Sequence, residues 1–195
     1  MLLKYLLLII LGYLIGSVPF SFIIAKLMGK IDIRNHGSGN SGATNVLRTL
    51  GTKAGLVAFF LDFLKGFILA LLSKKLLGME GAVLASTFAV IGHCYPFTLG
   101  FKGGKGVATC GGTIFALYPI IGLILIIIQF LIIFTTRIVS LASIITAISF
   151  PIVSFILKTP ASFNLYALLL GAFIVYKHKA NIKRLLSGTE SKFKK

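Results

Sequence analysis

Three polar stretches interrupt an otherwise apolar chain, at residues 37–48, 92–109 and 177–184. They are rich in glycine or in cationic side chains, and none of them contains an Asp or a Glu. Accessible backbone amides, together with Lys and Arg, bind phosphate, whereas hard metal ions need oxygen ligands such as carboxylates. The composition of the three stretches therefore predicts a site for phosphorylated ligands, with no metal and no cofactor.

The first stretch combines small residues with polar side chains. Ser38 and Gly39 lie near its start, where glycine suits the unusual backbone angles that an amide nest requires. We expect a helix to resume near Thr44 and Asn45, with Arg48 one turn further on, where its planar guanidinium can grip a phosphate. The alternative is a hydrophilic turn in which a Ser or Asn caps a helix.

The second stretch contains Gly103 and Gly104, followed by Lys105. It matches a nucleotide-binding Walker A loop only in part. Leu99 stands where that pattern has its first glycine, and Gly106 replaces the Ser or Thr that binds magnesium. Nucleotide hydrolysis is therefore not expected. The two glycines are predicted to offer amides to a phosphate, and Lys105 to supply the cation.

The third stretch is predicted to end the last membrane span. His178 and Asn181 are three residues apart, so they would share one face of a helix. This spacing leaves a functional and a structural interpretation equally open. The lysines beside them are expected to be anchors next to anionic lipid, and these are Lys177, Lys179 and Lys183.

Other polar residues fall at or near membrane depth. Asp62 and Lys65, at i and i+3, are predicted to form an internal ion pair with a structural role. Ser140 and Ser143 begin a later span, where small hydroxyl residues most often assist helix packing. His93 is expected to be a hydrogen-bonded histidine at a helix end.

Composition sets the class of protein. With 57% hydrophobic residues and a mean hydropathy of +1.00, the chain is too apolar for a soluble globule. A formal net charge of +16 suits either nucleic acid or an anionic membrane surface. Because the basic residues flank apolar segments, we expect a lipid bilayer and no nucleic acid as the partner. No linker divides the chain, so residues 1–195 are predicted to form a single domain.

The fold class predicted is all-α and polytopic, with about seven transmembrane helices. The expected spans are 3–27, 54–77, 80–95, 106–118, 120–136, 139–157 and 162–180. The third and fourth are short for a full crossing, and five spans is the alternative count. The N-terminus is predicted outside and the C-terminus in the cytoplasm, because few basic residues then fall on the outer side. Those outer residues are Lys4, Lys74, Lys75 and Lys158. All three polar stretches then lie on the cytoplasmic face, where we expect them to form one pocket.

The segments GSGNSGATNVLR, GHCYPFTLGFKGGKGVAT and KHKANIKRLLSGTE resemble those of bacterial acyl-phosphate:glycerol-3-phosphate acyltransferases, over essentially the whole chain. The resemblance implies an enzyme of phospholipid synthesis in the cell inner membrane, with its active site facing the cytoplasm. Its substrates would be acyl phosphate and glycerol-3-phosphate, and its product lysophosphatidic acid. The site residues implied are Ser38, Thr44, Asn45, Arg48, Lys105, Ser143, His178 and Asn181.

The residues alone do not identify the general base. No Asp follows any His by five residues, which excludes the His-Asp pair of soluble glycerolipid acyltransferases. Two candidates remain, His178 and the phosphate of the donor, and the resemblance favours the donor phosphate. Two other kinds of protein compete with the enzyme: a small organophosphate transporter, and a noncatalytic membrane scaffold that recruits anionic partners.

Overall fold

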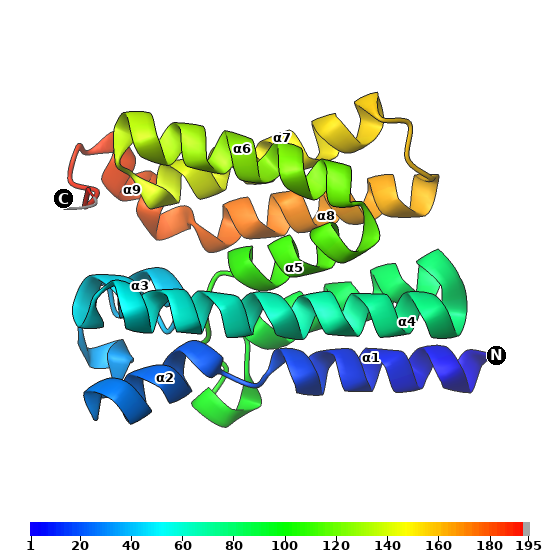
Figure 1. The fold of residues 1–195 in the computed structure, drawn as a ribbon, viewed down its shortest axis with the longest axis horizontal. Helices are drawn as coiled ribbons and strands as arrows, with labels where there is room; N and C mark the ends of the chain where they lie inside the picture. The colour runs from blue at the N-terminus through cyan, green and yellow to red at the C-terminus, as the bar shows by residue number, and fades with distance from the viewer. Residues whose placement is uncertain (193–195) are drawn as a thin grey trace. The chain divides into compact units, whose positions relative to one another are not determined.

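A computed structural model describes residues 1–192, in which every regular element is a helix (Figure 1). The chain divides into two compact units, Met1–Leu117 and Tyr118–Lys195. The helices of the first unit are α1 (Leu2–Gly16), α2 (Phe20–Gly29), η1 (Ile33–Asn35), α3 (Ala43–Leu50), α4 (Thr52–Cys94), η2 (Phe97–Leu99) and α5 (Val107–Leu117). Those of the second are α6 (Pro119–Thr136), α7 (Val139–Ile156), α8 (Ala161–Lys177) and α9 (Lys179–Leu186). A single domain over 1–195 stays a prediction.

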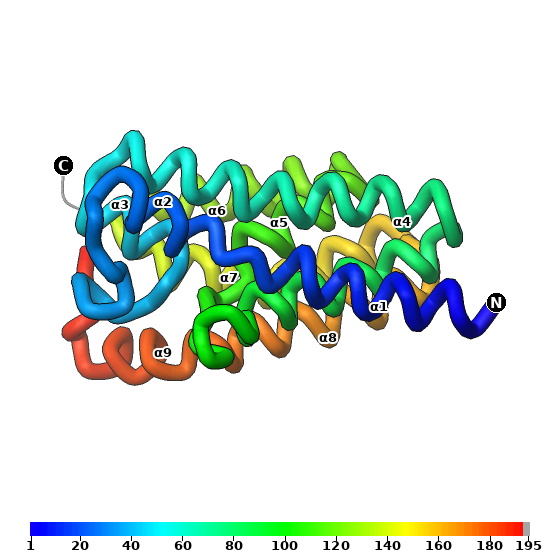
Figure 2. Tube along the Cα trace, turned by 90° about the horizontal axis from the view of Figure 1, so that it is seen from below, coloured from blue at the N-terminus to red at the C-terminus, as the bar shows by residue number. Residues whose placement is uncertain are grey.

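The first predicted span is broken in the middle. The helical path stops after Gly16 and resumes at Phe20, and Figure 2 shows this interruption between α1 and α2. Pro19 accounts for the break, because proline has no amide hydrogen and its ring clashes with the carbonyl four residues earlier. The span predicted over 3–27 falls within the apolar helical stretch Leu2–Gly29, but two helices rather than one form it. The break exposes carbonyls of α1 that need partners elsewhere.

The second and third predicted spans are two parts of α4. Leu77 and Gly78 depart from helical geometry there, and Gly78 adopts a left-handed φ of 67°. Figure 1 shows the chain doubling back at this point. Two apolar segments separated near residue 78 had been predicted, and the structure confirms them.

Small residues bring α1 against the second segment of α4. A β-carbon at Gly12 or Gly16 would strike the backbone of Ala85 or Ala89, and one at Gly92 would strike the Tyr13 carbonyl. The four-residue spacing on both helices is the small-xxx-small pattern that lets helices approach closely in lipid. This packing fixes where the end of α1 meets the end of α4.

Two adjacent glycines of α5 give a matched test of this close packing. A β-carbon at Gly112 would strike the Phe63 carbonyl of α4, whereas one at Gly111 would make only ordinary contact with the Phe63 ring. We expect Gly112→Ala to lower the free energy of unfolding by about 1–3 kcal/mol through overpacking. Gly111→Ala should be neutral or stabilising by up to about 1 kcal/mol, because alanine favours the helix. Equal effects on thermal unfolding in detergent would contradict this packing.

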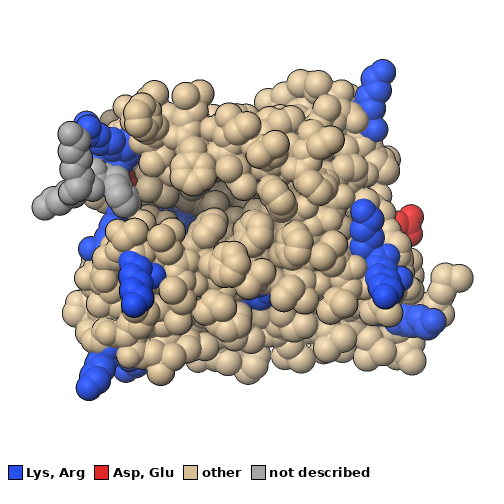
Figure 3. Space-filling view, viewed as in Figure 1, with Lys and Arg blue, Asp and Glu red and all other residues tan. Residues whose placement is uncertain are grey.

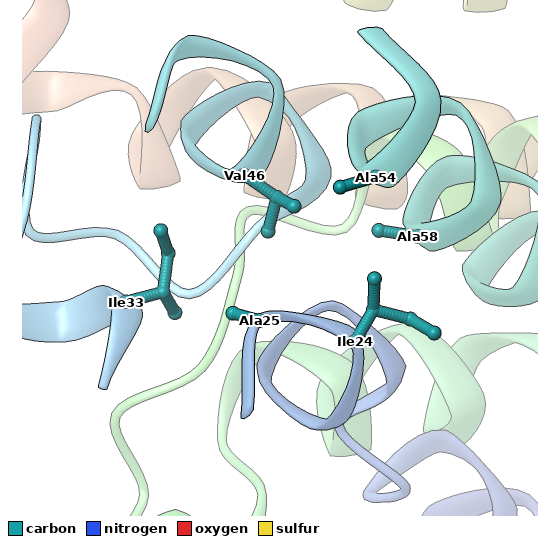
Figure 4. Close-up of a cluster of buried hydrophobic side chains, with 6 residues drawn as sticks. All are labelled: Ile24, Ala25, Ile33, Val46, Ala54 and Ala58. Carbon is teal, nitrogen blue, oxygen red and sulfur yellow. The ribbon is translucent and has the colours of Figure 1, made fainter. Parts of the chain in front are cut away.

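A buried apolar cluster supports the first polar stretch. Figure 4 shows that its side chains come from α2, η1, α3 and the start of α4. The residues are Ile24, Ala25, Ile33, Val46, Ala54 and Ala58. Residues 37–42 connect η1 to α3, and both of these elements contribute side chains to the cluster. Both ends of this loop are therefore anchored.

The second unit is built on α6, α7 and α8. Gly171 of α8 lies against the Ala147 carbonyl of α7, and rings of Phe150, Phe163 and Tyr166 pack together between these helices. The last predicted span, 162–180, ends early. α8 stops at Lys177, and the third polar stretch continues as the separate short helix α9.

The distribution of charged residues along the helices matches a membrane environment. On the face in Figure 3, Lys and Arg gather near the helix ends, and the surface between them is almost entirely uncharged. Within residues 1–192, four helical stretches are long and apolar enough to cross a bilayer, namely Leu2–Gly29, Thr52–Leu99, Pro119–Thr136 and Val139–Ile156. α5 and α8 are shorter apolar helices. At eleven residues α5 extends about 16 Å, about half of a hydrocarbon core of roughly 30 Å.

Candidate active site

The first two polar stretches meet in the first unit, although about sixty residues separate them. The Asn40 side-chain amide donates to the Gly103 carbonyl at 3.3 Å, and the Ser41 hydroxyl donates to the Lys102 carbonyl at 3.5 Å. The expectation that these two stretches come together is confirmed. Their meeting brings together the loops that precede Arg48 and Lys105.

Asn45 organises the first stretch. Its amide nitrogen donates to the carbonyls of Ile33, at 3.0 Å, and His36, at 2.8 Å. Its side-chain oxygen accepts from the Ser38 amide at 2.8 Å. Gly37 has a φ of 58° and lacks the β-carbon that would strike this oxygen. Asn45 is 2% exposed, so the structure gives it a loop-shaping role, and phosphate binding by Asn45 stays a prediction.

Other residues of the first stretch differ in accessibility. Ser38 and Gly39 are exposed, while Thr44 and Arg48 are partly buried on α3 and lie one turn apart. Gly39 has a φ of 71°, as expected for glycine in a tight turn, but its amide donates to the His36 carbonyl at 3.0 Å. That amide is therefore engaged within the loop and is not part of a phosphate nest here.

Gly103 and Gly104 serve a different purpose from the one predicted. Their amides donate to the carbonyls of Cys94, at 3.2 Å, and His93, at 3.1 Å. A β-carbon at Gly103 would strike the His93 carbonyl, and one at Gly104 would strike the His93 ring. These glycines let the loop lie against the end of α4, and in this structure their amides do not point at a ligand.

Lys105 follows this packed turn and is only partly buried. The next residue, Gly106, has a φ of 85° and faces Val90 and Cys94, where a β-carbon would be crowded. Lys105 is therefore held between two glycines that fix the loop against α4, immediately before α5 begins at Val107. A cation on such a constrained segment is held near one position, which favours ligand binding.

Arg34 is a link that the sequence did not suggest. Its guanidinium pairs with Asp32 through two nitrogens, at 2.7 and 3.0 Å, and it also donates to the Leu99 carbonyl at 3.5 Å. The Arg34 side chain and backbone amide hold the pKa of Asp32 at about 2. Arg34 thus connects the approach to the first stretch with η2 in the second.

Beneath the second stretch lies a cluster that we call the buried charge cluster, made of Asp62, Lys65 and His93. The Lys65 ammonium lies 2.8 Å from Asp62, and the His93 Nδ1 lies 3.1 Å from Lys65 and 3.4 Å from Asp62. The Ser21 hydroxyl donates to Asp62 at 2.6 Å. The predicted Asp62–Lys65 pair is confirmed, and His93 is a hydrogen-bonded histidine at a helix end, as expected.

The second unit holds the remaining predicted site residues. The Ser143 hydroxyl donates to the Val139 carbonyl one turn earlier, at 3.0 Å, and accepts from Gln129 at 3.4 Å. This arrangement ties α6 to α7, as a helix-packing serine would. The site role of Ser143 that the resemblance implies stays a prediction.

His178 and Asn181 lie where α8 gives way to α9. His178 occupies the junction, and Asn181 is in the first turn of α9, so the two remain one turn apart. Both are 3% exposed. The His178 Nδ1 lies 2.8 Å from the Ile174 carbonyl. Since a carbonyl can only accept, Nδ1 carries the hydrogen in this contact.

Glu190 contacts residues of the third polar stretch, and this role was not predicted from the sequence. It accepts from Ser140 and Asn181, each at 2.8 Å, and from Arg184 at 2.6 Å, and so joins α7, α9 and the C-terminal tail. Burial alone would raise the pKa of Glu190, but these three hydrogen bonds lower it below its ordinary value. The sequence did contain a signal for an ion pair here, because Glu190 is one of only four acidic residues in the chain and follows a basic stretch.

The stability supplied by Glu190 should depend on pH. A lowered folded-state pKa means that the contribution is complete above the unfolded value, about 4.3, and is lost as pH falls through the folded value. We expect Glu190→Gln to lower the free energy of unfolding by about 1–3 kcal/mol at pH 7. The difference from the native protein should shrink between pH 5 and 3 in thermal unfolding (about one unit around the ordinary pKa).

The comparison for this experiment is Asp32→Asn. The pKa of Asp32 is about 2, so the effect of that substitution should persist to lower pH than the effect of Glu190→Gln. A constant difference between Glu190→Gln and the native protein over the whole range would contradict the role assigned to the carboxylate.

Comparison with known proteins gives the family. The profile of the family described as glycerol-3-phosphate acyltransferase matches residues 6–188. The chain belongs to this family. The glycerol-3-phosphate acyltransferase of Aquifex aeolicus (strain VF5) is 49% identical over 192 residues, which cover 97% of this chain and 100% of that protein. The glycerol-3-phosphate acyltransferase of Bacillus subtilis (strain 168) is 45% identical over 188 residues, which cover 96% and 97%.

Two solved structures agree with this assignment to the glycerol-3-phosphate acyltransferase family. Both are crystal structures of PlsY, an integral membrane glycerol 3-phosphate acyltransferase. The glycerol 3-phosphate form has a TM-score of 0.94 and 47% identity, covering 97% of this chain and 96% of that one. The lysophosphatidic acid form has a TM-score of 0.91 and 46% identity, covering 97% and 95%. The protein is thus an all-α, multi-pass bacterial membrane protein of an acyltransferase family, as predicted.

Proposed function

We propose that this protein transfers an acyl chain from acyl phosphate to a hydroxyl of glycerol-3-phosphate, giving lysophosphatidic acid and inorganic phosphate. The observation that carries the proposal is the meeting of the two glycine-rich stretches, through Asn40–Gly103 and Ser41–Lys102. The two stretches, which contain no Asp or Glu, contribute one Arg and two Lys residues. Family membership supports the acceptor, because the relatives are named for glycerol-3-phosphate.

The chemistry requires charge neutralisation more than it requires a strong catalyst. The glycerol oxygen attacks the acyl carbonyl carbon, the bond from that carbon to the bridging oxygen breaks, and phosphate leaves with the bridging oxygen. Phosphate is a good leaving group, but two phosphate-bearing substrates repel each other. We assign Lys105 and Arg48 to neutralise this repulsion and hold the partners in line. Ser38 and Thr44 supply neutral donors to the same groups.

His178 and Asn181 are assigned to the reacting hydroxyl and carbonyl. The Asn181 amide donates to Glu190 at 2.8 Å, which fixes the orientation of the amide, and we assign Asn181 to the developing oxyanion. The His178 Nδ1 lies 2.8 Å from the Ile174 carbonyl, a contact that holds the ring at the junction of α8 and α9. The resemblance to acyl-phosphate-dependent acyltransferases favours the donor phosphate as the proton acceptor. We therefore assign proton removal to the donor phosphate, and the positioning of the hydroxyl to His178.

We further propose that the site faces the cytoplasm in the inner membrane. The basic residues near the three stretches support this orientation through the positive-inside rule. Both native cysteines are buried, so a cysteine introduced at an exposed position can be labelled selectively. Asn35→Cys and Ser187→Cys should react only with membrane-permeant reagents in intact cells, whereas Lys75→Cys should react with impermeant ones. The reverse pattern would overturn the orientation.

The experiment that tests the activity uses purified protein, a long-chain acyl phosphate and glycerol-3-phosphate, without added metal. We expect lysophosphatidic acid and phosphate in equal amounts, and no product when acyl-CoA replaces acyl phosphate. The rival is a small organophosphate transporter. Counterflow of labelled glycerol-3-phosphate into proteoliposomes without acyl phosphate would support the rival.

A further inference from the structure

The proposed mechanism does not use the buried charge cluster of the first unit, although burying its charges costs free energy. Lys65 is 6% exposed and Asp62 is 1% exposed, and no other charged residue lies between residues 54 and 72 of α4. Charges inside a membrane protein are expensive to bury, and they are usually found where they support function. An ion pair that only filled space could be replaced by apolar side chains at little cost.

Lys65 donates hydrogen bonds to backbone carbonyls at the break between α1 and α2. Its ammonium donates to the Gly16 carbonyl at 2.9 Å and to the Val18 carbonyl at 2.7 Å, on either side of Ser17, which follows the last residue of α1. The ammonium also forms an ion pair with Asp62 Oδ1 at 2.8 Å, and the other oxygen of Asp62 accepts from Ser21 of α2. The cluster therefore fixes the break between α1 and α2 to the first segment of α4.

His93 carries this rigidity to the glycine-rich loop. The Nδ1 edge of its ring is flanked by Lys65 and Asp62, as described above. Its opposite edge, at Nε2, is the group that a β-carbon on Gly104 would strike. The His93 backbone carbonyl also accepts from the Gly104 amide at 3.1 Å. Ring and carbonyl of one residue thus form the surface on which the loop rests.

This arrangement determines whether the His93 ring or the glycine-rich loop would move if a β-carbon were added at Gly104. A histidine ring at a crowded contact normally swings away at small cost. Here Lys65 and Asp62 hold the far edge of the ring, so the loop has to move instead. Any such movement is passed to Lys105, the next residue after Gly104.

We propose that His93, held by Lys65 and Asp62, is a positioning residue that sets where Lys105 presents its ammonium to a substrate phosphate. The inference rests on the proposed function, in which Lys105 binds phosphate. His93 itself does not contact the substrate. The buried charge cluster is then the support of the phosphate-binding loop, in addition to its role in joining α1, α2 and α4.

The test is a double-mutant cycle between Gly104→Ala and His93→Ser, with both KM values and kcat measured. Gly104→Ala alone should raise one KM by about tenfold, because the added methyl displaces the loop. The KM affected should be the one that rises in Lys105→Gln. Adding His93→Ser makes room for the methyl, so the double variant should lie within about threefold of His93→Ser alone, a non-additivity typical of contacting residues. Gly111→Ala is the control for a helical glycine-to-alanine change without crowding.

A second measurement does not depend on activity. The Gly103 amide donates to Cys94, so hydrogen exchange at residue 103 reports whether the loop is seated on α4. Gly104→Ala should speed exchange at residue 103, and His93→Ser in the same chain should restore part of the protection. Additive KM effects, or exchange that Gly104→Ala leaves unchanged, would overturn the proposal. If the native protein makes no lysophosphatidic acid, the proposed function fails, and the exchange data still decide whether His93 supports the loop.

Discussion

Lys105→Ala should lower kcat/KM for acyl transfer to glycerol-3-phosphate by about 100-fold, as expected when a charged hydrogen bond worth about 1.5–3 kcal/mol is lost. The loss follows from the position of this lysine between two glycines that fix the loop. The loop cannot adapt to bring another cation into place. Lys105→Arg keeps the charge but changes its shape, so it should recover part of the activity.

Lys102→Ala is the matched control for this prediction. Lys102 lies three residues earlier on the same loop, is exposed, and contributes only its backbone carbonyl to a contact with Ser41. Its side chain should be dispensable, and turnover should stay within about twofold of native, as for most exposed substitutions. Near-normal kinetics for Lys105→Ala, or an equal loss in both variants, would remove Lys105 from the site.

His178→Ala should lower kcat by about tenfold, which is less than the roughly 10²–10⁴ expected when a general base is lost. The reason is that the donor phosphate takes the proton in the proposed mechanism. The His178 ring, held 2.8 Å from the Ile174 carbonyl, then serves to position the hydroxyl. Substrate-assisted proton transfer needs His178 only to orient the hydroxyl.

His36→Ala serves as the comparison, because His36 is exposed and outside the three polar stretches. It should leave kcat unchanged. Steady-state rates for both variants should be measured with protein whose thermal unfolding is similar to native. A loss of 1,000-fold in His178→Ala would instead make His178 the general base and would exclude the donor phosphate from that role.

Much of the architecture follows from the sequence because the relevant signals are local. Apolar runs separated by glycine and proline locate the helical segments, and the i, i+3 spacing of Asp62 and Lys65 predicts their pairing. The meeting of the first two polar stretches also follows, since the spans between them return the chain to the same side. These features depend on neighbours in sequence or on the order of the spans.

What the sequence could not supply depends on distant contacts. A glycine can offer an amide or make space, and only the packing of residues 103 and 104 on the end of α4 shows which. Glu190 meets Asn181 and Ser140 only because the tail folds back after α9. The break at Pro19 was readable, but the continuous hydropathy of residues 3–27 concealed it. The shared pocket of all three stretches stays a prediction.

The most direct test of the account follows the bridging oxygen of the donor. Acyl phosphate labelled with ¹⁸O between the carbonyl carbon and phosphorus is mixed with glycerol-3-phosphate and purified protein, and products are weighed by mass spectrometry. Attack on the carbonyl carbon predicts that all label leaves with inorganic phosphate, and that each labelled phosphate is matched by one unlabelled lysophosphatidic acid. Label retained in free fatty acid, or labelled phosphate released without lysophosphatidic acid, would contradict acyl transfer as the function of this protein.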